Sequence, residues 1–381
     1  EPTITGFDQN PVYKWTVKGP NDAEAAEAGT DKTLSFIQLE TGDYTISLTI
    51  SDDSGITETK SATVTVTTEA TAYSHYISEV LEYNPAITNG KGLAFSTIDT
   101  PSTVLASVNT KLVDKPFDKN DLGVNLGSFG GSIVFRFDHT VMNVNGLRDF
   151  RIGSYSTKGA YPAQGVVYVS SDANGNGKAD DEWYELAGSE YYKPETIKNY
   201  RITYDRPDPN KIPEPDMGQQ WSDATYVPWK DNQGNTGYIA KNIYHTQSYY
   251  PMWIEENSLT FSGTRLKDNA TDESDTGKYY VLYSYPWGYV DNHPNDYKDL
   301  NSFDIEWAVD AEGNKVELHG VDFIKVYTAV NQYCGWIGET STEIIRAQDL
   351  HIAPPSIIVP DPVSEQMKLQ YDQAILKIKG L

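Results

Sequence analysis

The stretch from Gly165 to Glu190 constrains the fold more than any other part of this 381-residue chain. Its first part, GVVYVSS, alternates with the period of a β-strand, and WYEL near its end can return as the antiparallel partner. Between them lies an acidic loop, DANGNGKADDE, with a glycine at its sixth position. The stretch therefore predicts a β-hairpin whose turn is rich in oxygen atoms.

The acidic loop resembles the first part of an EF-hand calcium loop, in which oxygen ligands alternate and the sixth-place glycine lets the backbone turn around the ion. Trp183 stands at the twelfth place, where an EF-hand has a bidentate Glu. We expect a structural Ca²⁺ ion here; a polar turn built from Asx and Gly residues is the alternative. The candidate ligands are Asp172, Asn174, Asn176, the Lys178 carbonyl, Asp180, Asp181 and Glu182.

The composition favours an all-β fold. The chain has 27 Tyr and 8 Trp but only 4 Met, and Thr, Ser, Gly, Asn and Asp separate the apolar segments, a mix typical of strands joined by turns. Short alternating segments recur at even spacing, and no long amphipathic helix is evident, which favours a β-sandwich or jelly roll. The length allows two or three domains.

Charge and cysteine content exclude several classes of protein. A formal net charge of −24 argues against nucleic acid or an anionic membrane as the partner, because both require a basic surface. The single cysteine, Cys334, excludes an intrachain disulfide framework. No apolar run reaches membrane-spanning length. No signal peptide is present, and the abrupt start at Glu1 leads us to expect an export sequence upstream.

Residues 1–68 are predicted to form a small all-β module, with the segments YKWTV, GTDKTLSF, TGDYTISLTISDDSG and SATVTV. In these segments the chain resembles the PKD-like, immunoglobulin-type domains of bacterial surface proteins. The resemblance implies a β-sandwich that serves as a spacer or interaction module. One strand of such a sandwich is missing before Glu1, and we expect the tail, residues 354–381, to dock there as a strand. A frayed terminus is the alternative.

Residues 73–353 are predicted to form a second, larger domain. It contains LGSFGGSIVFRFDHTVMNVNGLRDFRI, the acidic hairpin, WGYVDN, FDIEWAVD, VDFIKVYTAV and GWIGETSTEI. In these blocks the chain resembles jelly-roll cell-surface proteins of Bacteroidetes. The resemblance implies an exported outer-membrane lipoprotein that captures a ligand, a glycan or a corrinoid (vitamin B12), for a TonB-dependent transporter. It transfers no catalytic residue.

The sequence gives no catalytic motif. There is no G-x-S-x-G elbow and no HExxH, and the six histidines are isolated. A glycosidase needs two carboxyl groups at a set separation, and 54 Asp and Glu residues do not single out a pair. A calcium-dependent carbohydrate-active enzyme, hydrolase or lyase, is therefore the alternative function, and a purely structural adhesion or spacer protein is another.

Aromatic side chains gather in two polar, turn-rich segments and are the best candidates for ligand binding. Flat rings offer apolar area to a ligand, and neighbouring amides and carboxylates can fix its hydroxyl groups. We expect residues 221–253 to present an exposed ligand face; packing in the core is the alternative for each ring. The candidate ligand-binding residues are Trp221, Tyr226, Trp229, Tyr249, Tyr250, Trp253, Trp287, Tyr289, Asp291 and Asn292.

Overall fold

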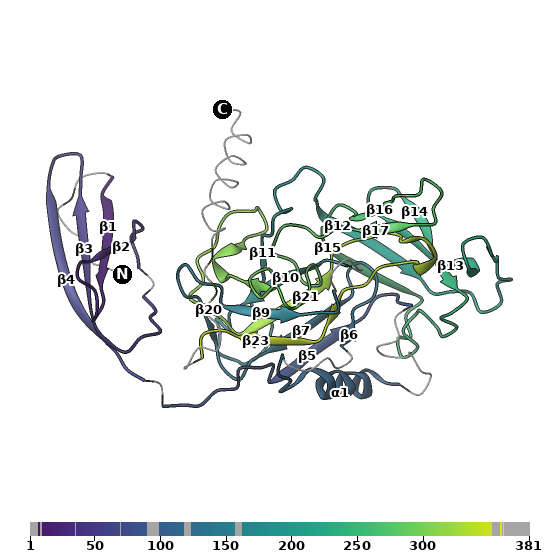
Figure 1. Ribbon diagram of the computed structural model, residues 1–381, viewed down its shortest axis with the longest axis horizontal. Helices are drawn as coiled ribbons and strands as arrows, with labels where there is room; N and C mark the ends of the chain where they lie inside the picture. Colours follow the sequence, from purple (N-terminus) through teal and green to yellow (C-terminus); the bar gives the residue numbers. More distant parts are fainter. Residues whose placement is uncertain are drawn as a thin grey trace. The chain divides into compact units, whose positions relative to one another are not determined.

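The computed structural model describes residues 7, 10–34, 36–68, 70–89, 99–117, 123–156, 162–352, 359 and 361. The chain divides into two compact units, one reaching Ala72 (unit 1) and one built on Tyr73–Ile352 (unit 2). The described residues form several antiparallel sheets and little helix, which confirms the predicted all-β sandwich class (Figure 1).

Unit 1 contains, within its described residues, one four-stranded antiparallel sheet. Tyr44, Leu48 and Ile50 on the third strand form its buried core. The strands, in their order across the sheet, are β2 (Ala26–Gly29), β1 (Val12–Lys18), β3 (Gly42–Ser51) and β4 (Thr57–Val66).

Most of the tail lies outside the described residues, and with it the segment expected to dock on unit 1. Its two described residues contact unit 2. The Arg148 amide donates to the Val359 carbonyl over 2.8 Å, and the Asp361 amide donates to the Gly146 carbonyl over 3.0 Å.

A six-stranded sheet lies at the centre of unit 2. The predicted hairpin is confirmed as two of its strands, with Tyr168 opposite Glu185 and Val169 opposite Tyr184. In their order across the sheet the strands are β19 (Ala308–Val309), β11 (Tyr184–Leu186), β10 (Gly165–Ser170), β21 (Phe323–Thr328), β7 (Ser132–Arg136) and β5 (Glu79–Asn84).

The central sheet is packed on both faces. Along β10, Val167 and Val169 belong to one hydrophobic core, whereas Val166 belongs to a second core against which Tyr168 packs. Because side chains on a strand alternate between faces, the sheet separates these two cores. The first core includes Phe150 and residues of the three-stranded sheet, and the second includes the four-stranded sheet.

The remaining strands of unit 2 form these outer layers and three small ribbons. The four-stranded sheet has the order β14 (Thr236–Asn242), β13 (Trp221–Asp231), β12 (Ile197–Asp205), β15 (Ser258–Arg265). The three-stranded sheet has the order β18 (Ser302–Phe303), β9 (Phe150–Gly153), β23 (Arg346–Asp349). The ribbons pair β16 (Ala270–Asp272) with β17 (Tyr280–Leu282), β20 (Gly320–Val321) with β8 (Val141–Met142), and β22 (Glu343–Ile344) with β6 (Val124–Asn125).

Unit 2 also contains an amphipathic helix that the sequence analysis did not anticipate, α1 (Pro101–Leu112). Thr100 caps its N-terminus in a reciprocal capping box with Thr103, and Pro101 occupies the first turn, where no amide hydrogen is needed. Val104, Val108 and Leu112 form its buried face. No helix among the described residues is long and apolar enough to cross a membrane.

Candidate ligand-binding site

Two cavities in unit 2 share the residues Glu339 and Thr340. The first, which we call the carboxyl cavity, has a volume of about 290 Å³, and the second, the aromatic cavity, about 300 Å³. The polar lining of the carboxyl cavity includes Asn89, Asn125, Glu339, Thr340, Ser341 and Glu343. The rings that line the aromatic cavity are Phe129, Trp229, Tyr238 and Tyr333.

A tight turn places Glu339 between the two cavities. The Cys334 amide donates to the Gly338 carbonyl over 2.8 Å, and residues between them form the short 3-10 helix η2 (Gly335–Ile337). Gly338 has a φ of 89°, a value that residues other than glycine rarely adopt. The turn leaves Trp336 43% exposed and brings Glu339 back into the interior, where it is 5% exposed.

Strand pairing places Glu343 in the same cavity. Glu343 on β22 lies directly opposite Asn125 on β6, and the Asn125 Nδ2 donates to the Glu343 Oε1 over 3.0 Å. Glu339 is held by the segment after β5, where the Asn89 amide donates to its Oε1 over 2.7 Å. Glu339 Oε2 is buried and has no hydrogen-bond partner of normal geometry.

Burial controls the electrostatics of the carboxyl cavity. It raises the pKa of Glu339 to about 8, although the Asn89 amide and the Thr88 hydroxyl oppose the effect. It raises the pKa of Glu343 to about 7. Asp291 lies next to Glu343, whose amide donates to Asp291 Oδ2 over 3.1 Å; burial and the charge of Glu343 raise the pKa of Asp291 well above its usual range.

The aromatic cavity has a wall built by β13 and β14. Trp229 pairs with Gly237 across these strands, and a Cβ atom added at Gly237 would lie 2.5 Å from Cζ2 of Trp229. The absence of a side chain at Gly237 therefore leaves room for the indole ring. Tyr238, 52% exposed, stands beside it.

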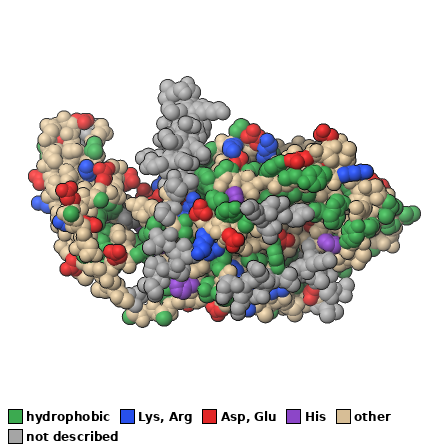
Figure 2. Space-filling model, viewed as in Figure 1, with side chains coloured by type: hydrophobic (Ala, Val, Ile, Leu, Met, Phe, Trp, Pro, Cys, Tyr) green, Lys and Arg blue, Asp and Glu red, His purple; other side chains and the backbone are tan. Residues whose placement is uncertain are grey.

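Exposed aromatic residues also lie on the part of unit 2 that contains β14, β17 and η2. Tyr244 and Trp336 form an edge-to-face pair with ring centroids 5.8 Å apart, and Tyr279 and Tyr283 flank β17. Figure 2 shows hydrophobic side chains gathered on the visible face over the end that carries β13 to β17 in Figure 1. Exposed apolar patches beside polar cavities are the kind of surface at which proteins commonly bind ligands.

The structure separates the predicted ligand-binding residues. Trp229 lines the aromatic cavity, and Trp253 lines a different cavity of about 770 Å³ beside β15. Trp221 is half-buried, with its ring 5.2 Å from that of Tyr333, and Tyr226 packs edge-on against Tyr249.

The prediction of an exposed, irregular face is wrong for much of residues 221–253. Most of this segment forms β13 and β14, because β-branched and aromatic residues pair well in sheets even between polar neighbours. Tyr249 and Tyr250, which follow β14, are fully buried in the second core. Trp287 and Tyr289 are also buried.

Two of the predicted polar residues lie behind the surface. Asp291, fully buried, accepts the Ser156 amide over 2.9 Å, and Asn292 bonds to Gln164 and to the Tyr285 amide. Asp291 is adjacent to the carboxyl cavity through Glu343.

Sequence reasoning missed Glu339, which lines both cavities, and Glu343, which lines one of them. Their only sequence signal is the run ETSTE after GWIG, two Glu residues four apart among small polar residues. Asn89 and Asn125 gave no signal, because they reach the site from positions far away in the chain.

The acidic loop has features that fit a cation. Asp172 accepts the Asn176 amide through Oδ1 over 3.0 Å and the Gly177 amide through Oδ2 over 2.8 Å, so its carboxylate organises the turn. Asn174 Nδ2 donates to Oδ1 of both Asp180 and Asp181 at 3.1 Å. Asp181 Oδ2 is buried without a hydrogen-bond partner.

Side-chain contacts within the loop also limit its ligand set. Glu182 accepts the Tyr184 hydroxyl over 2.8 Å. In the described part of the chain no three His, Cys, Asp or Glu side chains gather as a metal-binding group. A Ca²⁺ ion would therefore depend on the amide oxygens of Asn174 and Asn176 and on the Lys178 carbonyl as well as on carboxylates.

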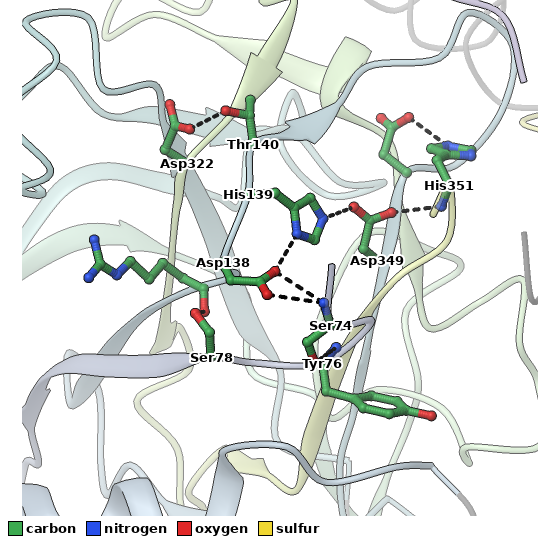
Figure 3. Close-up of polar contacts among 11 residues, drawn as sticks. Ser74, Tyr76, Ser78, Asp138, His139, Thr140, Asp322, Asp349 and His351 are labelled. Carbon is green, nitrogen blue, oxygen red and sulfur yellow. Dashed lines mark hydrogen bonds and ion pairs between the residues drawn. The ribbon is translucent and has the colours of Figure 1, made fainter. Parts of the chain in front are cut away.

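A histidine network near the start of unit 2 resembles a catalytic cluster but lacks its chemistry (Figure 3). His139 contacts Asp138 through Nδ1 and Asp349 through Nε2, both at 2.7 Å. Asp138 accepts the Ser74 amide, and Asp349 accepts the His351 amide over 2.6 Å. Both ring nitrogens of His139 are engaged by carboxylates, so the ring anchors the chain and does not serve as a general base.

Comparisons with known proteins leave the family open. No family model matches this chain, and no curated protein matches it. Among solved structures, the chain is similar to one titled as the structural basis for the promiscuous specificity of carbohydrate-binding modules from the β-sandwich superfamily. The sequence identity is 13%, the match covers 90% of this chain and 88% of that chain, and the TM-score is 0.13. A TM-score this low does not bear on the ligand.

Proposed function

We propose that the protein is a non-catalytic binding protein whose unit 2 captures a glycan in the carboxyl and aromatic cavities. The observation that supports this proposal is the pair of cavities that meet at Glu339 and Thr340, one lined by rings and the other by amides and carboxyl groups. Sugars present apolar C–H faces and hydroxyl edges, which match these two kinds of wall.

The wider setting of the proposal comes from the sequence resemblance. We propose an exported lipoprotein on the outer face of a Gram-negative cell that passes its ligand to a TonB-dependent transporter, with unit 1 as spacer or docking module. A corrinoid is a second candidate ligand. A corrin ring is larger than either cavity, so it would have to bind across the exposed aromatic residues, including Tyr244 and Trp336.

Calorimetric titration tests the proposal directly. A panel of neutral, amino-bearing and acidic glycans, together with cyanocobalamin, is titrated into the intact protein. Binding of a glycan that weakens at least tenfold in Trp229→Ala would support the aromatic cavity as the site, since stacking on a ring contributes about 1–3 kcal/mol. Tyr184→Phe is a control far from the cavities in sequence. No heat from any glycan would defeat the proposal.

One observation favours an enzyme as the second candidate. Glu339 and Glu343 line one cavity, and burial raises the pKa of Glu339 to about 8, as a general acid at neutral pH requires. Release of reducing ends from a polysaccharide, lost in Glu339→Gln, would establish hydrolysis. Binding without turnover would leave the capture function in place.

A further inference from the structure

The carboxyl cavity contains acidic groups without a basic partner. Among the described residues, none that lines it is Lys, Arg or His. The Asn125 amide is already used, since its Nδ2 donates to Ser341 Oγ and Glu343 Oε1, both at 3.0 Å. Glu339 Oε2 is buried and has no hydrogen-bond partner of normal geometry, and Glu339 lines the cavity.

The other titratable groups around Glu339 do not supply a positive charge. They include the carboxyl group of Glu343, the thiol of Cys334 and the phenols of Tyr155, Tyr204, Tyr249 and Tyr333. Burying an ionised carboxylate without a partner costs free energy. Glu339 is therefore neutralised either by binding a proton or by pairing with a cation that enters the cavity.

We propose that the carboxyl cavity selects an amino-bearing glycan, with the ammonium group of a hexosamine unit paired to Glu339. This inference rests on the proposed function and names its ligand class. The sugar ring would extend toward Trp229 and Tyr238 in the adjoining aromatic cavity, which shares Glu339 and Thr340 with the first. The net charge of −24 attracts cationic glycans and repels sulfated or uronic ones.

The proposal predicts how many protons are released when the ligand binds. In the free protein at mildly acidic pH we expect Glu339 to carry a proton, because no described residue that lines its cavity is basic and burial raises its pKa. When the ammonium group enters, it stays protonated and pairs with the carboxylate. The proton of the carboxylic acid then goes to the solvent, so binding of the amine releases one proton, whereas binding of a neutral sugar releases none.

The test is calorimetry at mildly acidic pH in two buffers of different ionisation enthalpy. The probes are glucosamine tetramer, its N-acetylated counterpart and cellotetraose. We expect the glucosamine tetramer to bind at least about tenfold more tightly than the two uncharged tetramers and to release a proton, because only its ammonium group can pair with the Glu339 carboxylate. Glu339→Gln should remove both the preference and the proton release.

Control variants separate loss of the charge from loss of the fold. Glu185 is another buried carboxyl group, which accepts the Tyr168 hydroxyl over 3.0 Å. It is not among the residues that line either cavity, so Glu185→Gln should keep the preference. Glu339→Asp keeps the charge but withdraws it by one methylene, and it should retain part of the preference.

Three results would overturn the inference. Equal affinity for all three tetramers would remove the amine selectivity and leave the capture function standing. No binding of any tetramer would remove both. Binding of Ca²⁺ alone that disappears in Glu339→Gln would show that the cavity takes a metal ion in place of an amine.

Discussion

At the scale of single residues, Asp172 fixes the conformation of the acidic loop. Its two carboxylate oxygens accept the amides of Asn176 and Gly177, which sets the turn in which the other oxygens gather. We expect Ca²⁺ to raise the free energy of unfolding by about 2.7 kcal/mol when its concentration is a hundredfold above Kd. Asp172→Ala should abolish this gain, measured as the thermal midpoint with calcium and with chelator.

A matched control for this prediction is Asp310→Ala. Asp310 organises a similar turn by accepting the amides of Glu312 and Asn314, but it lies outside the predicted ligand set. Its variant should keep the full calcium response. A midpoint of the parent protein that is indifferent to chelator would remove the calcium prediction.

At the scale of elements, Tyr327 on β21 ties the central sheet to the four-stranded sheet. Its hydroxyl donates to the Thr264 carbonyl over 2.9 Å and accepts the Thr264 amide over 2.8 Å, both buried. Tyr327→Phe leaves two buried backbone groups of β15 unpaired, so we expect a loss of about 1–3 kcal/mol in urea unfolding. Tyr238→Phe, at an exposed position of β14, should change the unfolding free energy little.

The histidine network gives β23 and the start of unit 2 a pH-dependent stability. Burial alone would lower the pKa of His139, but its hydrogen bonds to Asp349 and Asp138 outweigh burial and raise it above 6.5. The stabilisation is therefore fully present below pH 6.5 and is lost as the pH rises through the folded-state value.

The pH dependence is checked by measuring urea unfolding of His139→Gln and of the parent protein at a series of pH values below and above 6.5. The difference in unfolding free energy should be largest on the acidic side and should shrink toward alkaline pH. The control is His293→Gln, which also removes a histidine, but one whose ring contacts the Tyr285 carbonyl in place of a carboxylate. A constant difference at all pH values would contradict the assignment.

The elements that the sequence predicted best are those whose pattern is local. The β10–β11 hairpin follows from the alternation of residues 166–169 and from the glycines of the loop. Helix α1 was missed because its Ser, Thr and Asn residues favour turns as readily as helix, and its stability comes from the buried Val104 and Val108.

The ligand site was less predictable, because burial is decided by packing between distant segments. Tyr249 and Trp229 have similar polar surroundings in sequence, yet one is in the core and the other lines a cavity. The contact of the Asn89 amide with Glu339 joins residues 250 positions apart, and no local pattern announces it.

At the scale of the whole molecule, the division into two units predicts two thermal transitions. Unit 2 contains both large cores and unit 1 only a small one, so we expect unit 1 to unfold first. A bound glycan should raise only the transition of unit 2, because ligand stabilises the part that holds it. Differential scanning calorimetry with and without glycan checks this, and a single transition that shifts as a whole would contradict it.

The cavity at Glu339 also offers a practical measure of correct folding. Its walls come from the chain after β5, from β6, and from the turn before β22, so it exists only when these remote segments have assembled. A resin that carries the captured sugar would therefore retain natively assembled chains and let misassembled ones pass. Affinity chromatography would then test the folding of the variants outside the cavities, such as Asp172→Ala, Tyr327→Phe and His139→Gln.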